Sequence, residues 1–197
     1  MPKQRADLLL VARGLVESRA KAQALIMAGL VYVDTARVNK AGDMIADDKD
    51  IIIKGQDHPW VSRGGVKLAH GLKHFNFDPT GRIGLDVGAS TGGFTDVLLT
   101  NGAKHVYAVD VGHGQLAWKL RADPRVTVLE KTNARHLTTA LIPEPIGALV
   151  CDASFIGLRT ILPAGLALCA PGAWAVALIK PQFEAGRDRV GSKGVVR

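Results

Sequence analysis

The sequence predicts an α/β protein in which a doubly wound parallel sheet follows a small α+β unit. From about residue 80 onwards, short apolar segments alternate with segments of helical character. This order is typical of parallel strands joined by right-handed crossovers. The preceding residues lack the alternation and indicate short helices followed by short strands. A chain of 197 residues has room for one medium domain and one small one.

The first region, residues 1–58, is expected to form the small unit. Its apolar side chains have helical spacing over residues 6–13. Ser18 is a favoured N-cap residue for a second helix, and this helix is expected to end at Gly29, because glycine readily adopts the conformation that follows a helix. Short strands are expected after it, at 30–33 and 51–53.

Basic residues dominate the start of the chain. The whole protein carries 25 lysine and arginine residues against 18 aspartate and glutamate residues, a net charge of +7. Positions 1–40 are predominantly basic, whereas 41–57 are predominantly acidic. A basic surface on a two-helix unit suits the phosphate backbone of a nucleic acid, although an ordinary solvated helix face explains the same charge equally well.

The second region, 69–197, is expected to follow a hinge at 59–68. In the hinge the pair Gly64-Gly65 allows a bend, and Lys67 lies near the start of a helix. Ligands of parallel sheets bind outside the carboxyl ends of the strands. Strands are expected near 83–87, 106–110, 126–129, 147–152 and 174–180, with helices near 92–101, 114–121 and 158–169.

One uncharged stretch, 161–179, is almost long enough to span a membrane. Pro163, Pro171 and Gly172 interrupt it, and the last two form a turn signal. We therefore expect a buried helix, a turn and a core strand, and no membrane partner. The charged and only briefly apolar N-terminus does not resemble a signal peptide, so a cytoplasmic location is expected.

A glycine-rich turn, L-D-V-G-A-S-T-G-G-F at 85–94, follows the first strand of the expected sheet. Glycines at such a turn let backbone N–H groups approach a ligand, and Asp110, after the next strand, is placed to accept hydrogen bonds from both hydroxyls of a ribose. The turn lacks both the dinucleotide pattern and the lysine of a phosphate-binding loop. A nucleoside cofactor with little phosphate remains, and S-adenosylmethionine fits best.

Two further strand ends carry charged residues. Lys180 ends an apolar strand that is expected to be buried, where a lysine is disfavoured unless it is paired. Asp152, at the end of the preceding strand, is the expected partner, either in a structural ion pair or in acid–base chemistry beside the cofactor. Cys151 is interpreted as a core residue, and its spacing from Cys169 is typical neither of a disulfide framework nor of a metal site.

A longer pattern runs from Arg5 through the first region: R-A-D-x-x-L-V-x-R-G-L-x-x-S-R-x-x-A-x-x-L-I-x-A-G-x-V-x-V-D. It resembles the alpha-L RNA-binding module of a ribosomal small-subunit protein, pseudouridine synthases and tyrosyl-tRNA synthetases, and the similarity covers most of 5–54. In such modules two helices form the surface that faces the RNA. The resemblance therefore implies phosphate contacts by Arg5, Arg13, Arg19 and Lys21.

Six motifs in the second region carry another resemblance. They are W-V-S-R-G-G-x-K-L at 60–68, L-D-V-G-A-S-T-G-G-F at 85–94, D-V-G-x-G-Q-L at 110–116, T-N-A-R at 132–135, D-A-S-F-I at 152–156 and K-P-Q-F-E at 180–184. Together they resemble the TlyA-type family of haemolysin-named bacterial ribosomal RNA methyltransferases, which are related to the FtsJ-type ribose 2′-O-methyltransferases. The resemblance implies a Rossmann-like class I methyltransferase sheet.

The family uses a Lys-Asp-Lys-Glu tetrad, and the matched motifs place its first three members at Lys67, Asp152 and Lys180. The fourth member, a glutamate in a later strand, has no counterpart before Arg197, and Glu184 is not a substitute for it. The family sheet has seven strands where five are expected here. The chain is therefore expected to be truncated at its C-terminus, with an incomplete sheet.

The same resemblance implies how the cofactor is held. Asp110 is expected to bind the ribose of S-adenosylmethionine, and Asn133 is expected to contact the edge of the adenine. The remaining contacts are expected from the turn near the methionine moiety, at Gly88, Ser90, Gly92, Gly93 and Phe94.

The implied reaction is methyl transfer from S-adenosylmethionine to a ribose 2′-hydroxyl of ribosomal RNA, with cytidine as the target nucleoside. Lys180 either accepts the hydroxyl proton or stays charged and stabilises the developing alkoxide, and the sequence leaves both roles open. Two other functions compete. The missing glutamate favours a non-catalytic RNA-binding protein. A pore-forming haemolysin is the least favoured function, because no amphipathic or membrane-spanning segment of the sequence supports it.

Overall fold

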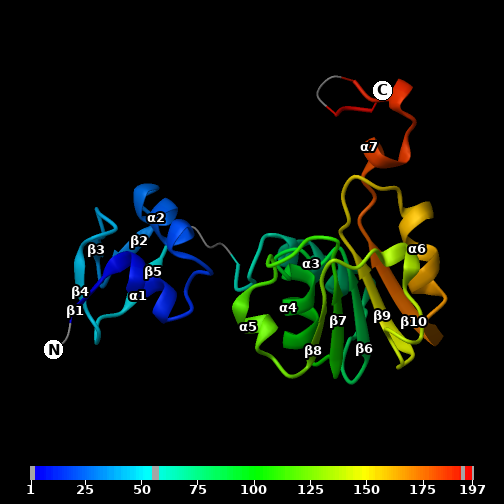
Figure 1. Cartoon of the computed structure of the whole chain (residues 1–197), viewed down its shortest axis with the longest axis horizontal. Coiled ribbons are helices and arrows are strands. Elements are labelled where there is room, and N and C mark those ends of the chain that lie inside the picture. The colour runs from blue at the N-terminus through cyan, green and yellow to red at the C-terminus, as the bar shows by residue number, and fades with distance from the viewer. Residues whose placement is uncertain (1–2, 55–57, 192–193, 197) are drawn as a thin grey trace. The chain divides into compact units, whose positions relative to one another are not determined.

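The structure, a computed structural model, describes residues 3–54, 58–191 and 194–196. The chain divides into two compact units, Met1–Pro59 and Trp60–Arg197 (Figure 1). The first is a small α+β unit and the second is an α/β unit with a five-stranded parallel sheet, which confirms the predicted fold class.

The second half of the segment expected to act as a hinge, 64–68, is helical, whereas 59–63 form bends and a turn. Gly64 and Gly65 lie in the first turn of helix α3 (Gly64–Phe75) and form no bend. A Cβ atom on Gly65 would lie 2.7 Å from Cδ1 of Trp60, so the indole occupies the space that a side chain would need. The glycine pair therefore serves close packing at the start of α3.

Two helices pack together on short antiparallel strands in the first unit. As predicted, Ser18 caps the second of these helices, because its hydroxyl accepts a hydrogen bond from the N–H of Lys21 at 3.2 Å. Leu10, Ile26 and Val31 are among the largest fully buried side chains here. Strand β2 pairs with β3 and β5, and β1 pairs with β4. The elements are β1 Lys3–Arg5, α1 Ala6–Ala12, α2 Arg19–Met27, β2 Val31–Val33, β3 Ala36–Arg37, β4 Met44–Ala46 and β5 Ile51–Ile53.

The second unit is built on one parallel sheet with the strand order β10-β9-β6-β7-β8. Its strands are β6 Ile83–Val87, β7 His105–Val109, β8 Val126–Leu129, β9 Ile146–Cys151 and β10 Cys169–Ala177. Besides α3, its helices are α4 Gly93–Thr100, α5 Trp118–Arg121, η1 Ala134–His136, α6 Leu158–Leu166, α7 Pro181–Glu184 and η2 Arg187–Arg189.

Helical layers cover both faces of this sheet (Figure 1). Strand β7 shows the alternation that this requires: Val106 and Ala108 pack with the core under α3 and α4, whereas Tyr107 and Val109 pack with the core under η1 and α6. Successive side chains of a strand point to opposite faces, so an apolar run is buried on both sides. This confirms why the strands appear as continuous apolar segments in the sequence.

The strand order creates a switch point between β6 and β9. The chain passes from β6 outwards to β7 and β8 on one side, and then crosses to β9 and β10 on the other. The loops that leave the carboxyl ends of β6 and β9 therefore diverge. Doubly wound sheets bind their ligands in the crevice that such diverging loops leave.

Two predicted boundaries near the C-terminal end differ from the structure. Helix α6 ends at Leu166, and strand β10 already begins at Cys169, so the expected turn at Pro171-Gly172 lies within an irregular strand whose register shifts before Trp174. An edge strand tolerates proline because one side of its backbone pairs with no neighbour. Among the described residues, no helix combines the length and apolar character needed to cross a membrane.

The end of β10 also differs from the prediction. The strand stops at Ala177, and Lys180 lies beyond it as the residue that precedes α7. Leu178 still packs partly buried against the core, whereas Ile179, the last apolar residue before the lysine, is 72% exposed. Lys180 is therefore presented from a connecting segment, above the carboxyl end of the sheet.

Candidate active site

The glycine turn after β6 lies directly against the segment that follows β9. Gly88 has a φ of +83°, and a Cβ atom on it would lie 3.0 Å from Cα of Ala153. A Cβ on Gly93, the first residue of α4, would lie 2.8 Å from the backbone nitrogen of Gly65. Side chains are excluded at both positions, because three chain segments meet at the switch point.

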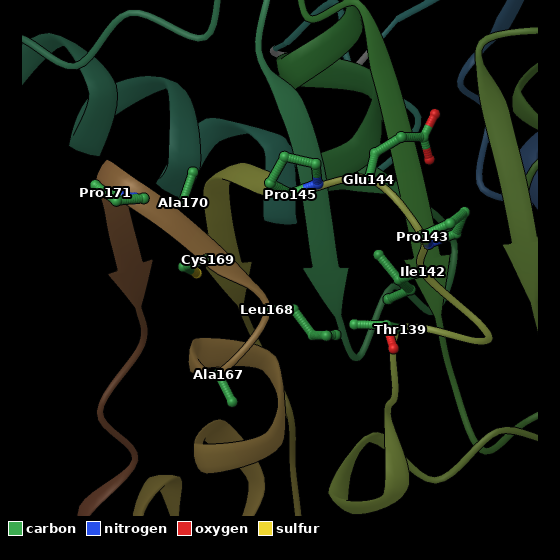
Figure 2. A pocket seen from close by; sticks show the side chains of 10 residues that line it. All are labelled: Thr139, Ile142, Pro143, Glu144, Pro145, Ala167, Leu168, Cys169, Ala170 and Pro171. Carbon is green, nitrogen blue, oxygen red and sulfur yellow. The ribbon is translucent and has the colours of Figure 1, made fainter.

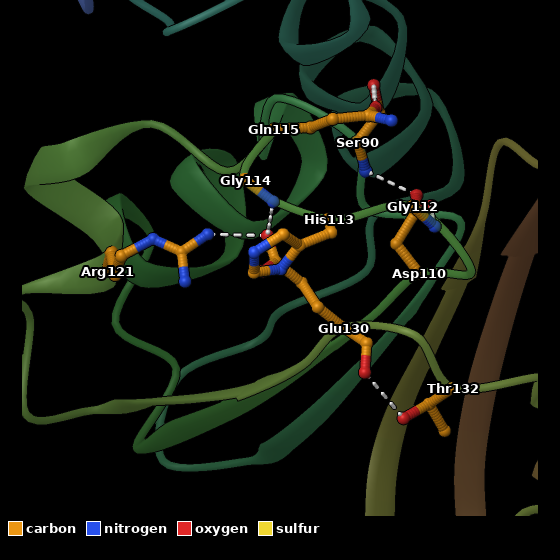
Figure 3. A network of polar contacts seen from close by, with 9 residues as sticks. All are labelled: Ser90, Asp110, Gly112, His113, Gly114, Gln115, Arg121, Glu130 and Thr132. Atoms are coloured by element: carbon orange, nitrogen blue, oxygen red, sulfur yellow. Dashed lines mark hydrogen bonds and ion pairs between the residues drawn. The ribbon is translucent and has the colours of Figure 1, made fainter.

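Asp110 connects the glycine turn to the loop after β7. One carboxylate oxygen accepts the N–H of Ser90 at 2.8 Å, and the other accepts the N–H of Gly112 at 2.7 Å (Figure 3). The hydroxyl of Ser90 also donates to Oε1 of Gln115 at 3.1 Å. Each carboxylate oxygen has further acceptor capacity, so Asp110 is held in a fixed position and still offers sites to ligand hydroxyls.

Glu130 directly follows β8 and also binds the loop after β7. It was not among the predicted site residues. Its carboxylate accepts the N–H of Gly114 at 2.9 Å, pairs with Nδ1 of His113 at 2.9 Å and bonds the guanidinium of Arg121 at 2.5 Å (Figure 3). The guanidinium hydrogen bond is the largest of the causes that lower the pKa of Glu130 to about 2. An acid immediately after a strand was the available signal, as it was for Asp110.

Helix α5 is shorter than predicted. The helix was expected from residue 114, but it begins at Trp118. Gly114 has a φ of +69°, which lies outside the helical range, and its N–H is bound by Glu130. Residues before Trp118 therefore form a braced loop beside the glycine turn.

The three residues of the predicted tetrad converge. Nζ of Lys67 lies 3.0 Å from one carboxylate oxygen of Asp152, and Nζ of Lys180 lies 2.7 Å from the other. The Asp152 side chain is 19% exposed, that of Lys180 is 21% exposed, and that of Lys67 is 51% exposed. One carboxylate thus joins two ammonium groups, at the carboxyl end of β9 and beside the Gly88 turn.

Lys180 makes two hydrogen bonds in addition to its ion pair with Asp152. Its Nζ donates to the main-chain oxygen of Asp152 at 3.0 Å and to the hydroxyl of Ser154 at 2.7 Å. A lysine ammonium has three N–H donors and no acceptor. The ion pair and the two hydrogen bonds therefore hold this nitrogen in a fixed position.

Beneath the glycine turn lies a buried carboxyl group that was not predicted from the sequence. Asp86, in β6, is 1% exposed, and one of its oxygens accepts the N–H and the hydroxyl of Thr95 at 2.9 and 2.7 Å. Burial raises the pKa of Asp86 to about 7. Because Thr95 lies in α4, Asp86 holds the start of this helix against the end of β6.

The other predicted site residues occupy different environments. Phe94 is only 3% exposed, and its side chain packs in the core. Oδ1 of Asn133 accepts the N–H of Arg135 at 3.1 Å at the start of η1. Cys151 is fully buried, and burial raises the pKa of its thiol to about 11, as expected of a core residue. Glu184 accepts the N–H of Leu158 at 2.7 Å and so caps α6.

In the first unit, two of the predicted RNA-binding arginines share one buried carboxylate. Asp7 is fully buried and pairs with Nε of Arg5 at 3.0 Å and with Nε of Arg19 at 2.7 Å. The guanidinium groups remain about half exposed, so Asp7 orients them without removing them from the surface. Arg13 donates to the main-chain oxygen of Lys49 at 2.7 Å, and it too is exposed.

A hollow of about 420 Å³ lies at the opposite edge of the sheet (Figure 2). The segments that line it, 139–145 and 167–171, precede or begin β9 and β10. Glu144 supplies a carboxylate at its rim, bonded to the hydroxyl of Tyr107. The length of the strands thus separates the hollow from Lys67, Asp152 and Lys180, which we call the Asp152 cluster.

Comparison with known proteins decides the family. The model of the FtsJ-like methyltransferase family matches residues 60–197, which contain the Gly88 turn and the Asp152 cluster. The chain belongs to the FtsJ-like methyltransferase family. The S4 domain model matches residues 4–52 of the first unit.

Individual FtsJ-like relatives span nearly all of this chain. It is 49% identical over 195 residues to the 16S/23S rRNA (cytidine-2′-O)-methyltransferase TlyA of Mycobacterium tuberculosis, covering 98% of this chain and 73% of that protein. It is 42% identical over 194 residues to hemolysin A of Brachyspira hyodysenteriae, covering 98% and 80%. These similarities confirm the predicted resemblance to the TlyA-type methyltransferases.

A solved structure agrees with both units of the fold. A protein of Streptococcus thermophilus described as a hemolysin aligns with a TM-score of 0.71 at 47% identity. The alignment covers 100% of this chain and 72% of that one. Similar proteins therefore carry both methyltransferase and hemolysin names.

Proposed function

We propose that this protein transfers the methyl group of S-adenosylmethionine to a ribose 2′-hydroxyl of ribosomal RNA. The observation that carries the proposal is the Lys67–Asp152–Lys180 cluster at the switch point of the sheet, in contact range of the Gly88 turn. Membership of the FtsJ-like family supports methyl transfer. The name of the Mycobacterium tuberculosis relative supports a cytidine of ribosomal RNA as the target.

The residues at the site fit S-adenosylmethionine. We assign its ribose hydroxyls to Asp110, whose two oxygens each accept only one backbone N–H in the structure. Its adenine is assigned to Asn133. Its methionine part is assigned to the turn residues Gly88, Ser90, Gly92, Gly93 and Phe94. When bound, this cofactor supplies an electrophilic methyl group on a sulfonium.

Lys180 is assigned the role of a charged stabiliser. Its nitrogen is paired with the carboxylate of Asp152 and donates hydrogen bonds to the main-chain oxygen of Asp152 and to the hydroxyl of Ser154, so the ammonium is held in place before the reaction. The hydroxyl proton passes to solvent water, and an N–H of this ammonium turns from a neutral acceptor to the ribose oxygen as negative charge develops on it. Such preorganised donors stabilise developing charge without a large rearrangement.

Lys67 and Asp152 hold that ammonium in place. Asp152 fixes Lys180 through one oxygen and Lys67 through the other, so the positions of the two lysines depend on each other. Lys67 is about half exposed and is assigned to the RNA strand beside the reacting ribose. Alignment of the hydroxyl with the methyl–sulfur bond then contributes through proximity.

The first unit is assigned to RNA binding. The S4 match covers its helices, and Arg5, Arg13, Arg19 and Lys21 give it exposed cationic groups for phosphates. A protein that modifies ribosomal RNA works where ribosomes assemble, so a cytoplasmic location forms part of the proposal.

The test measures cofactor binding and methyl transfer with the same 197-residue protein. Calorimetry gives the affinity for S-adenosylmethionine, and transfer of labelled methyl groups is followed on unmethylated ribosomal RNA and on assembled subunits. Lys180→Ala is expected to lower the rate by about 10²–10⁴ while cofactor affinity stays nearly unchanged. Lys104→Ala, at the opposite edge of the sheet, is the matched control.

Each alternative has its own outcome in this test. RNA binding without methyl transfer by the wild-type protein would identify a non-catalytic RNA-binding protein. Methylation of the base instead of the ribose, read from the hydrolysed nucleosides, would contradict the proposed acceptor.

A further inference from the structure

The exposed side of α3 is basic and continues outwards from the Asp152 cluster. Residues 58–77, which include all of α3, contain no aspartate or glutamate. One side of the helix is buried through Leu68, Gly71 and Leu72, which pack towards the sheet. On the other side Lys67, His70, Lys73 and His74 are exposed. We call these four residues the α3 face.

Three residues of the α3 face lie in a row along the helix. Lys67, His70 and His74 follow one another at intervals of three and four residues, so they lie on the same side of the helix. With a rise of 1.5 Å per residue, the row is about 10 Å long. At about 3.4 Å per nucleotide along a helical strand, this length corresponds to about three phosphates. Because Lys67 belongs to the Asp152 cluster, the row begins at the candidate active site.

The two histidines of the α3 face present aligned rings. Their centroids lie 6.1 Å apart with an angle of 14° between the planes. His74 also packs edge-on against Phe75, with 4.8 Å between centroids, and Phe75 is 57% exposed. Exposed flat rings beside lysines are the combination that binds unpaired bases and phosphates of RNA.

Lys67 of the α3 face is paired with Asp152, whereas the ammonium of Lys73 is not neutralised by any of the described residues. In these residues His70, Lys73 and His74 form no ion pair, whereas Lys119 pairs with Asp96 and Arg125 pairs with Asp123. A patch that carries cations and rings but no acid complements a polyanion. Two apolar residues of α3, Val66 and Phe75, are exposed as well, but lysines and histidines lie beside them, whereas the core of a protein–protein interface is depleted of charged residues.

We propose that the α3 face binds the RNA strand next to the target nucleotide. This inference rests on the proposed function and specifies which surface of the methyltransferase unit guides the substrate to it. Lys73 contacts a phosphate, and His70 and His74 contact the sugar and base of a neighbouring nucleotide. The strand leaves the site along α3, starting from Lys67.

The two kinds of contact predict different results for two variants. Affinity for an unmethylated ribosomal RNA transcript is measured at several salt concentrations. Lys73→Gln is expected to lower the slope of log affinity against log salt by about one, because one phosphate is no longer neutralised. The double variant His70→Ala/His74→Ala is expected to weaken binding by at least about fivefold, because the rings can no longer stack on the bases.

Lys104→Gln is the matched control, since Lys104 is an exposed lysine at the amino end of β7, away from the candidate site. It is expected to leave both RNA affinity and salt slope unchanged. Affinity for S-adenosylmethionine is expected to be equal in all variants, which also shows that they are folded.

Two outcomes would overturn the inference. The first is that the α3 variants bind free RNA like the wild type, with an equal salt slope. The second is that they bind free RNA normally but methylate assembled subunits poorly, which would assign the α3 face to a ribosomal protein. Wild-type protein that binds the RNA through the α3 face yet transfers no methyl group would instead contradict only the proposed function.

Discussion

Asp152 and Lys180 lie 2.7 Å apart, carboxylate oxygen to ammonium nitrogen, and the nitrogen is also bonded to the hydroxyl of Ser154. The ion pair and two hydrogen bonds, one of them to Ser154 and one to the main-chain oxygen of Asp152, fix the ammonium in place. Ser154 was part of a matched motif, but nothing in the sequence assigned it a role. In the structure it is a positioning residue for Lys180.

Ser154→Ala is expected to lower kcat for methyl transfer by about tenfold or more, because one hydrogen bond to a charged group is removed. KM for RNA and the affinity for S-adenosylmethionine should remain unchanged, since within the described part of the chain the hydroxyl is hydrogen-bonded to Lys180 alone. Ser154→Thr keeps the hydroxyl and should restore most of the rate. Steady-state kinetics with saturating cofactor measures these effects, and an equal decrease in the Ala and Thr variants would exclude the role.

Asp110→Ala is expected to weaken S-adenosylmethionine binding by about 1–3 kcal/mol, because the acceptor of the ribose hydroxyls is removed. The same change also frees the N–H groups of Ser90 and Gly112, so the loop after β7 should become more mobile. Calorimetry measures the affinity. Hydrogen exchange at the Gly112 N–H measures how mobile the loop has become, so this effect can be distinguished from the loss of the ribose acceptor. Unchanged affinity would remove Asp110 from the ribose site.

Glu130→Gln is expected to make the stability of the second unit less dependent on pH. The folded protein lowers the pKa of Glu130 from 4.5 to about 2, so its charged form stabilises the fold fully above pH 4.5. This stabilisation is lost as the pH falls towards 2. The difference in unfolding free energy between wild type and variant should therefore be constant above pH 4.5 and shrink below it. Urea unfolding at a series of pH values measures the difference, and a gap that does not change with pH would contradict this account.

Replacing Arg13, Arg19 and Lys21 by glutamine is expected to weaken RNA binding and to lower its salt slope by about one for each phosphate that is no longer bound. Affinity for S-adenosylmethionine should not change, because these residues belong to the first unit. Lys49→Gln is the control, since the Lys49 ammonium is already paired with Asp34 at 2.8 Å. Filter binding over a range of salt measures the slope. Intact affinity in the triple variant would place the main RNA-binding surface elsewhere.

The pairing of Arg5 and Arg19 with Asp7 sharpens that experiment. Asp7 is buried, and the hydrogen bond from Arg5 is the largest cause that holds the pKa of its carboxyl far below the ordinary range. Removing Arg19 leaves this carboxylate with Arg5 and Gln23 as partners. The role of Arg19 in binding a phosphate is therefore best judged from the salt slope, which a change in packing does not alter.

The sequence by itself determined the strands, their parallel arrangement and the side chains at their carboxyl ends. Apolar runs such as 83–87 and 147–152 are local signals, and they appear in the structure with shifts of one residue or none. The carboxyl ends of parallel strands meet at one edge of a sheet. For this reason Asp110 and Asp152 could be assigned to one site without knowledge of the tertiary structure.

Only the tertiary structure decided which of these residues touch. Lys67 and Asp152 are 85 positions apart in the chain, and their contact depends on β9 lying beside β6 and on α3 starting at the same edge. Packing likewise determines three other features: the hydrogen bond from Lys180 to Ser154, the three partners of Glu130 and the burial of Asp86. Local periodicity reports which way a side chain faces, whereas its partners are set by segments that come together only when the chain folds.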